Sequence, residues 1–379
     1  MIETPAFDAA IIGGGVMGCT TTLFLARGGM RVVLLERGSL CREASGVNAG
    51  TLTMHMTRAA LIPYALGGWK LWTTTPAWLG SDVGARATDG LSLAFTETEA
   101  ALVRQRAEVR REAGAPIEIV GPDRAREIEP GLSQKVLLAA YCPIDGFASA
   151  YLTGLAFRTA LLKAGADIRE NAAVLGIERE KGGFVVRTGK DRLRARRIVL
   201  AGGVWLEEML RWFEIDIPIK CLINQLVVTE RLAPVMRTVM GIASGLLSLK
   251  QFENGTVLIG GGWQGLGDRK RGGVEIIPEN LIGNLRLARY AIPALSRARV
   301  ARIWLGLEAE TADAMPIIGP IPGVENAFVI GSVHSGYTSG PYMGQLLADL
   351  ILGRELPLPL FDPARLLRAS LASHGDVPR

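Results

Sequence analysis

Cysteine and histidine are scarce in this chain. Its 379 residues include only four cysteines and three histidines, which are Cys19, Cys41, Cys142, Cys221, His55, His334 and His374. No two cysteines form a CxxC pair and the histidines lie far apart, so the sequence offers neither a redox dithiol nor a metal cluster. Dispersed cysteines are typical of a reduced protein, and we expect a cytoplasmic chain without a metal site.

Clusters of one charge and long apolar stretches are also lacking. The 42 Lys and Arg are scattered among 37 Asp and Glu, which leaves a net charge of +5 and no basic cluster. We therefore expect no nucleic-acid partner. One uncharged stretch, 9–26, has the length of a membrane helix, but Gly13-Gly14-Gly15 interrupts it. It is better explained as a strand, a glycine turn and a helix, so we expect no membrane span.

Glycine, by contrast, is abundant. It accounts for 46 of 379 residues, about 12%, where about 7% is usual. Such an excess indicates many tight turns or close backbone approaches to a ligand. The length predicts two or three domains, and the 49% of hydrophobic residues suffices for a large core.

The order of apolar segments predicts a divided domain. A strand–helix–strand pattern opens the chain at 9–12, 16–27 and 32–35, and similar units return at 151–201 and at 327–352, where a helix is expected over 342–352. Between them the pattern changes to strands and turns, at 222–229, 246–252 and 256–259. We predict one discontinuous α/β domain with a mostly antiparallel β domain inserted in two pieces.

A glycine motif, Gly13-x-Gly15-x-x-Gly18, lies between the first strand and the first helix. Its glycines permit a tight turn, the approach of a pyrophosphate to backbone N–H groups, and close helix–strand packing. Glu36 ends the second strand, where its carboxylate can accept both hydroxyls of an adenosine ribose. A second match, 260–265, is followed by 267–273, in which no helix can begin. We therefore expect one dinucleotide site and a β-domain loop at 260–265.

Further segments carry a resemblance to a known family. They are Ser45-Gly46-x-Asn48-Ala49-Gly50, the stretches 198–205 and 304–319, and the glycine loop 331–336. Together with the first glycine motif they make the chain similar, over nearly its full length, to the FAD-dependent D-amino-acid oxidase superfamily. The resemblance is nearest to the glycine oxidase and sarcosine oxidase β-subunit branch. That branch includes subunits of hetero-oligomeric amine, proline and opine dehydrogenases, so the resemblance implies partner subunits.

The resemblance implies a fold and a cofactor site. It implies an α/β protein with a discontinuous Rossmann-like FAD-binding domain (1–80, 145–215 and 312–379) and an inserted, mostly antiparallel β-sheet substrate domain (81–144 and 216–311). FAD would be non-covalent, because 48–51 differs from the pattern of relatives that attach FAD through a histidine near the place of His55. The implied cofactor-binding residues are Gly13, Gly15, Val16, Met17, Gly18, Glu36, Arg37, Ser45, Asn48, Ala49, Gly50, Thr51, Val174, Ala201, Gly202, Trp205, Gly306, Gly336, Tyr337, Thr338 and Ser339.

Two departures from the family pattern concern the substrate. Glu308 and His334 stand where amino-acid-oxidising members carry arginines that clamp the substrate carboxylate. We expect Glu308, Trp263 and His334 to contact the substrate, with His334 and Tyr337 as candidate catalytic residues. If Glu308 faces the cavity, it would favour a positively charged group and repel a carboxylate. The alternatives are that Trp263 serves packing alone and that Glu308 pairs with Arg302.

The resemblance implies oxidation of a C–N bond. We expect an amine or an amino or imino acid, with secondary amines and opine-like compounds favoured, to lose hydride to flavin N5 and form an imine that hydrolyses. This chemistry needs orientation and a neutral amine more than a dedicated acid or base. Two alternatives stay open: oxidation of the C–OH bond of a hydroxy acid, and a flavin-binding subunit that only relays electrons or scaffolds a complex.

Overall fold

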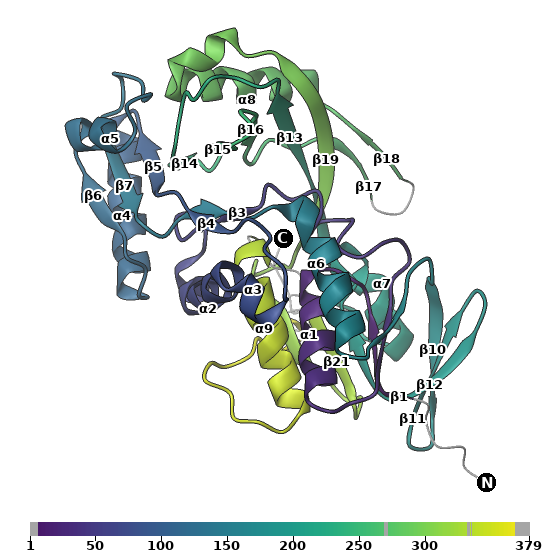
Figure 1. Ribbon diagram of the computed structural model, residues 1–379. Coiled ribbons are helices and arrows are strands. Elements are labelled where there is room, and N and C mark those ends of the chain that lie inside the picture. The colour runs from purple at the N-terminus through teal and green to yellow at the C-terminus, as the bar shows by residue number, and fades with distance from the viewer. Residues whose placement is uncertain (1–6, 269–271, 332–333, 335, 368–379) are drawn as a thin grey trace, which may run out of the picture.

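The computed structural model describes residues 7–268, 272–331, 334 and 336–367. Two eight-stranded sheets dominate these residues, and Figure 1 shows one of them below the other. The lower sheet comes from the start, the middle and the end of the chain. The upper sheet comes from the two stretches between them, so the discontinuous α/β architecture that the sequence predicts is confirmed.

The lower sheet is parallel at its centre. Its strands run in the order β9 (Asp167–Arg169), β2 (Val32–Leu35), β1 (Phe7–Ile12), β12 (Arg192–Leu200) and β21 (Ala327–Gly331). Antiparallel additions complete it, namely β20 (Ile317–Pro320) on β21 and the hairpin β10 (Val174–Glu180)–β11 (Gly183–Thr188) on β12. Alternate residues of β1 enter two different cores, Ala9 and Ile11 on one face and Ala10 and Ile12 on the other. Burial on both faces explains why these strands are continuous apolar runs.

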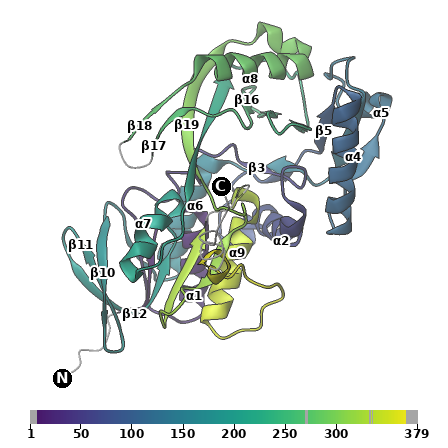
Figure 2. The same ribbon diagram turned by 180° about the vertical axis from the view of Figure 1, so that it is seen from behind.

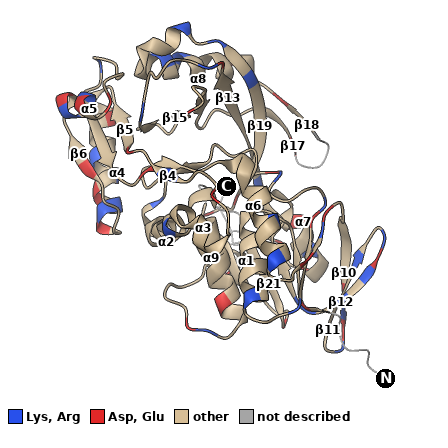
Figure 3. Ribbon diagram, viewed as in Figure 1, with Lys and Arg blue, Asp and Glu red and all other residues tan. Residues whose placement is uncertain are grey.

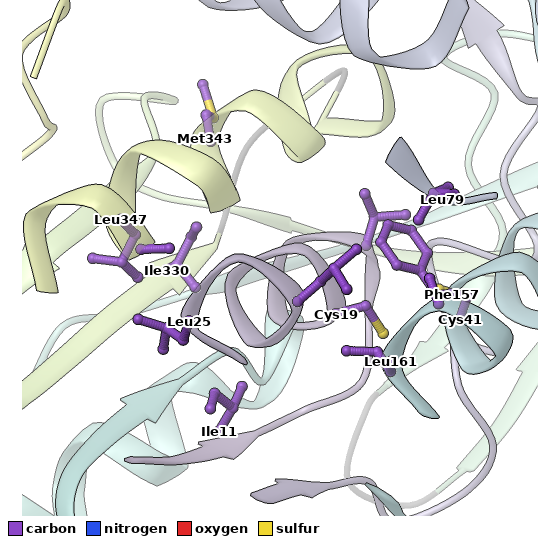
Figure 4. Close-up of a cluster of buried hydrophobic side chains, with 14 of the residues drawn as sticks. Ile11, Cys19, Leu25, Cys41, Leu79, Phe157, Leu161, Ile330, Met343 and Leu347 are labelled. Atoms are coloured by element: carbon purple, nitrogen blue, oxygen red, sulfur yellow. The ribbon is translucent and has the colours of Figure 1, made fainter. Parts of the chain in front are cut away.

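Helices cover one face of this sheet. They are α1 (Val16–Arg27), α2 (Ile62–Thr73), α3 (Thr75–Trp78), α6 (Ala150–Lys163) and α9 (Gly336–Ile351), whereas α7 (Leu206–Leu210) belongs to the opposite face. Figure 4 shows the core between them, with Ile11 of β1, Leu25 of α1, Phe157 and Leu161 of α6, and Met343 and Leu347 of α9. This packing fixes the N-terminal ends of α1 and α9 at the same edge of the sheet.

The upper sheet is antiparallel except for one pair. Its order is β19 (Val300–Glu310), β13 (Lys220–Thr229), β16 (Val257–Gly260), β15 (Ser248–Gln251), β14 (Val239–Ile242), β5 (Gly90–Ala94), β7 (Leu138–Cys142) and β6 (Glu118–Val120), in which β14 and β5 are parallel. Figure 2 shows α8 (Pro278–Ala291) over this sheet, while α4 (Glu97–Glu112) packs beside β5 and β7 and α5 (Pro122–Ile128) beside β7. The strands of both sheets fall within the segments predicted for the two domains, whose exact bounds stay a prediction.

Short strands complete the fold. β3 (Thr51–Leu52), β8 (Gly146–Phe147) and β4 (Arg86–Ala87) form a small sheet, and β17 (Leu266–Asp268) pairs with β18 (Gly272–Glu275). The second glycine motif begins at the end of β16 and continues into β17 without a helix, as predicted, although 269–271 of the following stretch lie outside the described residues. Among the described residues, no helix is both long and apolar enough to cross a membrane.

One helix begins earlier than the sequence predicts. The structure starts α9 at Gly336, whereas the sequence predicts a first residue at Tyr342, directly after Pro341. Proline has no N–H to donate inside a helix, so it leaves one carbonyl without its usual partner. Here the Trp72 indole of α2 donates to the carbonyl of Tyr337 at 2.7 Å, and Trp72 also stacks on the Tyr337 ring. A tertiary contact thus compensates the missing helical hydrogen bond.

Candidate active site

A cavity of about 1010 Å³ lies between the two sheets. Its lower wall consists of the glycine loop after β1, the ends of β2 and β12, and the start of α9. Its upper wall includes residues of the second sheet, among them Asn224, Gln225 and Leu226 of β13, together with residues of α4. Small residues at the same level, Ser92, Gly241 and Ser248, keep this wall open. A nucleotide and a second small molecule can therefore share one continuous space.

The glycine loop has the form of a cradle. Gly13 has φ +111°, and a Cβ there would overlap the carbonyl of Ala201, while a Cβ at Gly18 would overlap the carbonyl of Gly13. These two glycines are therefore required for the fold itself. Gly15 differs, because the nearest atom to a Cβ there is Ser45 Oγ at 3.3 Å. Gly15 leaves space above the N-terminus of α1, where a pyrophosphate can approach the backbone, so the loop fits a dinucleotide.

Glu36 is held rigidly at the end of β2. Its Oε2 accepts a hydrogen bond from Gly14 N and its Oε1 accepts one from Gly38 N, each at 2.7 Å. Each carboxylate oxygen keeps capacity for a further donor, as two ribose hydroxyls require. Beside it, the Arg37 guanidinium lies 3.5 Å from the centre of the Trp205 ring, and the two form a cation–π pair along the cavity wall.

Most of the predicted cofactor residues lie together. The cavity is lined by Gly13, Gly15, Val16, Met17, Gly18, Glu36, Arg37, Ser45, Asn48, Ala49, Thr51, Val174, Ala201, Gly202, Trp205, Gly306, Gly336 and Tyr337. Three others lie behind the wall. The backbone of Gly50 accepts a hydrogen bond from Ala148 N, and Thr338 Oγ1 donates to the carbonyl of Thr51 at 3.1 Å. Ser339 is buried within α9.

Glu308 and His334 form a pair across the cavity. His334 Nδ1 lies 2.6 Å from Glu308 Oε1, and the Asn224 amide donates to Glu308 Oε2. The hydrogen bond to Glu308 raises the pKa of His334 above its ordinary value, against the opposing effect of burial. The partners of Glu308 are thus His334 and Asn224, not Arg302. A protonated His334 neutralises the carboxylate, which weakens the repulsion of substrate carboxylates expected from Glu308 alone.

Two predicted residues are placed differently from the others. Trp263 does not line the cavity; its indole donates to the Leu246 carbonyl at 2.7 Å, and its ring packs against Gly283 of α8. Tyr337 lines the cavity with a buried ring, but its hydroxyl lies 2.7 Å from Thr153 Oγ1. Burial raises the pKa of Tyr337 well above its ordinary value. These contacts favour packing for Trp263 and a structural hydroxyl for Tyr337.

The structure adds a buried histidine–aspartate pair that no sequence pattern predicts. His55 Nδ1 lies 2.8 Å from Asp145 Oδ2, and Asp145 also accepts hydrogen bonds from Thr53 Oγ1 at 2.6 Å and Met54 N at 2.7 Å. Burial alone would raise the pKa of Asp145, but His55 and these donors lower it below its ordinary value. His55 lines the cavity, and its Nε2 has no partner among the described residues.

A buried lysine is a second feature that the sequence does not predict. Lys250 of β15 is 1% exposed, and its Nζ donates to Thr51 Oγ1. Burial lowers the pKa of Lys250 from 10.5 to about 7. No local pattern marks this group, since its partner Thr51 is 199 residues away.

Comparisons with known proteins agree with this geometry. The family described as FAD dependent oxidoreductase (DAO) matches residues 8–350. The chain is 29% identical to a subunit of opine oxidase from Rhizobium meliloti, over 92% of this chain and 94% of that protein. The crystal structure of glycine oxidase from Geobacillus kaustophilus superposes with a TM-score of 0.85 at 26% identity, covering 94% of this chain and 97% of that one. L-proline dehydrogenase from P. horikoshii shares the fold, with a TM-score of 0.88 at 24% identity over 97% and 99% of the two chains.

Proposed function

The chain belongs to the FAD dependent oxidoreductase family, and we propose that it oxidises a C–N bond of a carboxylated secondary amine, such as an opine, to an imine that hydrolyses in water. The observation that carries this proposal is the continuous cavity of about 1010 Å³ between the glycine loop and the upper sheet. A cofactor on the loop and a substrate beneath the sheet would meet inside it. The similarity to an opine oxidase subunit and to glycine oxidase supports an amine as the substrate.

The residues that would hold non-covalent FAD follow from their positions. The backbone at Gly15 and the N-terminus of α1 would bind the pyrophosphate, and Glu36 would accept the ribose hydroxyls. The N-terminus of α9 at Gly336, which lines the cavity, favours negative charge. When bound, FAD supplies the hydride acceptor for the C–H bond beside the amine nitrogen.

The substrate end of the cavity has no arginine at the positions of Glu308 and His334. Glu308 and His334 bind each other there, with Asn224 as the further partner of Glu308. A simple amino acid would find no guanidinium at these two positions. We therefore expect glycine, D-alanine and sarcosine to be poor substrates and larger carboxylated secondary amines to be better ones.

We also propose that the chain works with other subunits. Two of its relatives are themselves subunits of opine oxidases, and they match it over nearly their whole length. In addition, α6 presents apolar side chains to solvent on one face, with Tyr151 89% exposed, Leu155 65% and Leu162 57%. An apolar stripe on an outer helix supports burial against another protein. Light scattering of the natively expressed protein tests this, and a fully active lone monomer would contradict it.

The cytoplasm is the compartment that the cysteines favour. Cys19, Cys41 and Cys142 are buried free thiols, and Cys221 is a partly buried one. Free thiols persist in reducing compartments. Fractionation of the native host tests this assignment, and recovery in an oxidising compartment would contradict it.

An anaerobic flavin-bleaching screen tests the proposed reaction. The purified protein should be yellow and should release one FAD on denaturation. Mixed without oxygen with amino acids, N-methyl amines, imino acids and opines, it should lose flavin absorbance fastest with a carboxylated secondary amine. Bleaching by hydroxy acids alone would favour C–OH oxidation. Failure of every amine to bleach the flavin would favour an electron-relay subunit and overturn the proposal.

A further inference from the structure

Two arginines of α4 line the cavity beneath the upper sheet. Arg106 and Arg110 lie one helical turn apart, on the same stripe as the buried residues Val103 and Ala107. At this spacing, side chains on a helix are neighbours. Together they bring two positive charges to one wall of the cavity. Neither the glycine loop nor the Glu308–His334 pair uses them.

Backbone carbonyls hold both guanidinium groups in place. Arg106 Nη1 donates to the carbonyl of Ala243 at 2.5 Å, and Arg110 Nε donates to the carbonyl of Thr57 at 2.8 Å. Thr57 and Ala243 come from segments that lie far apart in the sequence. The two terminal nitrogens of Arg110 have no hydrogen-bond partner among the described residues. A guanidinium anchored through Nε presents the edge with both terminal N–H groups, the geometry that a carboxylate accepts.

Three other arginines of α4 and α5 are paired with carboxylates. Arg111 pairs with Glu108, Arg124 with Glu127 and Arg126 with Asp123, each one turn away along α4 or α5. Figure 3 shows these helices with blue and red segments side by side. Arg106 and Arg110 form no ion pair with a carboxylate in the described part of the chain. Burial and the charge of Arg106 lower the pKa of Arg110 to about 10, while the charge of Asp145 acts in the opposite direction.

The carboxylate whose charge acts on Arg110 is already engaged. Asp145 acts on the charge of Arg110, but its carboxylate oxygens accept from His55, Thr53 and Met54. His55 lines the same cavity, and its buried Nε2 has no partner within the described residues. Because the Asp145 carboxylate accepts from Nδ1, Nε2 of the neutral ring is an acceptor. Among the described residues, the Asp145 carboxylate is thus held by His55, Thr53 and Met54 rather than by either arginine.

We propose that Arg106 and Arg110 form the carboxylate-binding subsite of this protein, and that the ligand is a carboxylated amine whose carboxylate points toward α4. This inference rests on the proposed function for the amine, whereas the carboxylate subsite stands on the arginine geometry alone. The Arg106–Arg110 subsite takes the place of the arginine clamp that Glu308 and His334 do not form. Arg110 contributes more than Arg106, because Arg106 is exposed and solvent weakens its interaction.

Non-reactive thioethers test the subsite apart from catalysis. The probes are (methylthio)acetate, thiodiacetate and the uncharged (methylthio)acetamide, titrated into the FAD-loaded protein while the flavin spectrum is followed. A thioether cannot be oxidised to an imine, so its binding reports on recognition alone. We expect (methylthio)acetate to bind at least about tenfold more tightly than the amide, the effect of about 1.4 kcal/mol.

Variants on one helix supply the matched comparison. The acid-to-amide preference is the ratio of the affinities for (methylthio)acetate and (methylthio)acetamide. Arg110→Gln should reduce this ratio to about one, and Arg106→Gln should reduce it less. Arg104→Gln removes an exposed arginine of α4 that does not line the cavity, and should leave the preference unchanged. Arg110→Lys keeps the charge without the planar fork and should fall between wild type and Arg110→Gln. Thermal unfolding and FAD content verify that each variant is folded.

The outcomes separate the two proposals. A preference retained in Arg110→Gln, or lost equally in Arg104→Gln, would overturn the subsite even if amines bleach the flavin. A preference that disappears only in the Arg106 and Arg110 variants supports the subsite even if no amine bleaches it. Equal binding of acid and amide to the wild type would also overturn it.

Discussion

Lys250 should make the stability of this protein rise with pH through the neutral range. Its side chain is fully buried and its pKa is lowered from 10.5 to about 7, because burial penalises the charged ammonium. In the unfolded chain the lysine regains its ordinary value. Between the two values the unfolded state binds more protons than the folded state, so raising the pH favours the folded state.

The size of the effect follows from the two pKa values. Between them, the free energy of unfolding changes by up to about 1.4 kcal/mol for each pH unit. From about pH 7 to about pH 9 the rise amounts to roughly 2 kcal/mol, because Lys250 is half protonated in the folded state near pH 7. A change of that size is a large share of the stability of a typical domain.

Urea unfolding at several pH values measures this effect. Lys250→Met removes the titrating group, so its profile should be flatter than that of the wild type by the same roughly 2 kcal/mol. Lys70→Met, on the exposed surface of α2, is the matched control and should keep the wild-type slope. Parallel profiles for the wild type and Lys250→Met would refute the reasoning, since the buried lysine would then carry no proton linkage.

Three further predictions follow from the site. Gly15→Val should fold normally and lose FAD, because the new side chain enters the cradle. Gly18→Ala should instead lower the unfolding temperature, because its Cβ overlaps the carbonyl of Gly13. Equal FAD content in Gly15→Val and wild type would contradict this prediction. Glu308→Gln should return the pKa of His334 toward its ordinary value, and NMR titration of His334 in the two proteins measures this. In the wild type, the stability that the pair adds should be present below about pH 6.5 and lost as the pH rises through the folded pKa of His334. The same His334 titration in Glu308→Gln and wild type would contradict the prediction. Asp145→Asn should lower the free energy of unfolding by about 3 kcal/mol near neutral pH, because it breaks the buried pair with His55. In the wild type, the stability that the Asp145 carboxylate adds should vanish as the pH falls through its lowered pKa. Identical denaturation curves of variant and wild type at neutral pH would argue against the buried pair.

Short-range patterns in the sequence sufficed for the nucleotide-binding half. β1, α1 and β2 fall at the predicted segments, and Glu36 lies at the end of β2 against the glycine loop. These features depend on residues within about one strand–helix–strand unit, where spacing fixes geometry. The alternation between αβ units and antiparallel strands likewise predicted the two inserted pieces. The predicted start of α9 was wrong because the compensation for Pro341 comes from Trp72, 265 residues from the carbonyl it meets.

Only the tertiary structure decided which side chains face one another at the substrate end. His55 meets Asp145 across 90 residues, Arg110 meets the Thr57 carbonyl across 53, and Lys250 meets Thr51 across 199. No local pattern encodes such pairs, because they arise where the upper sheet and α4 dock onto the lower sheet. Trp263 illustrates the same limit, since its position in the sequence did not reveal that it faces α8. The sequence determined the cofactor and the architecture through short-range geometry, whereas the charges around the substrate were decided by the packing of distant segments.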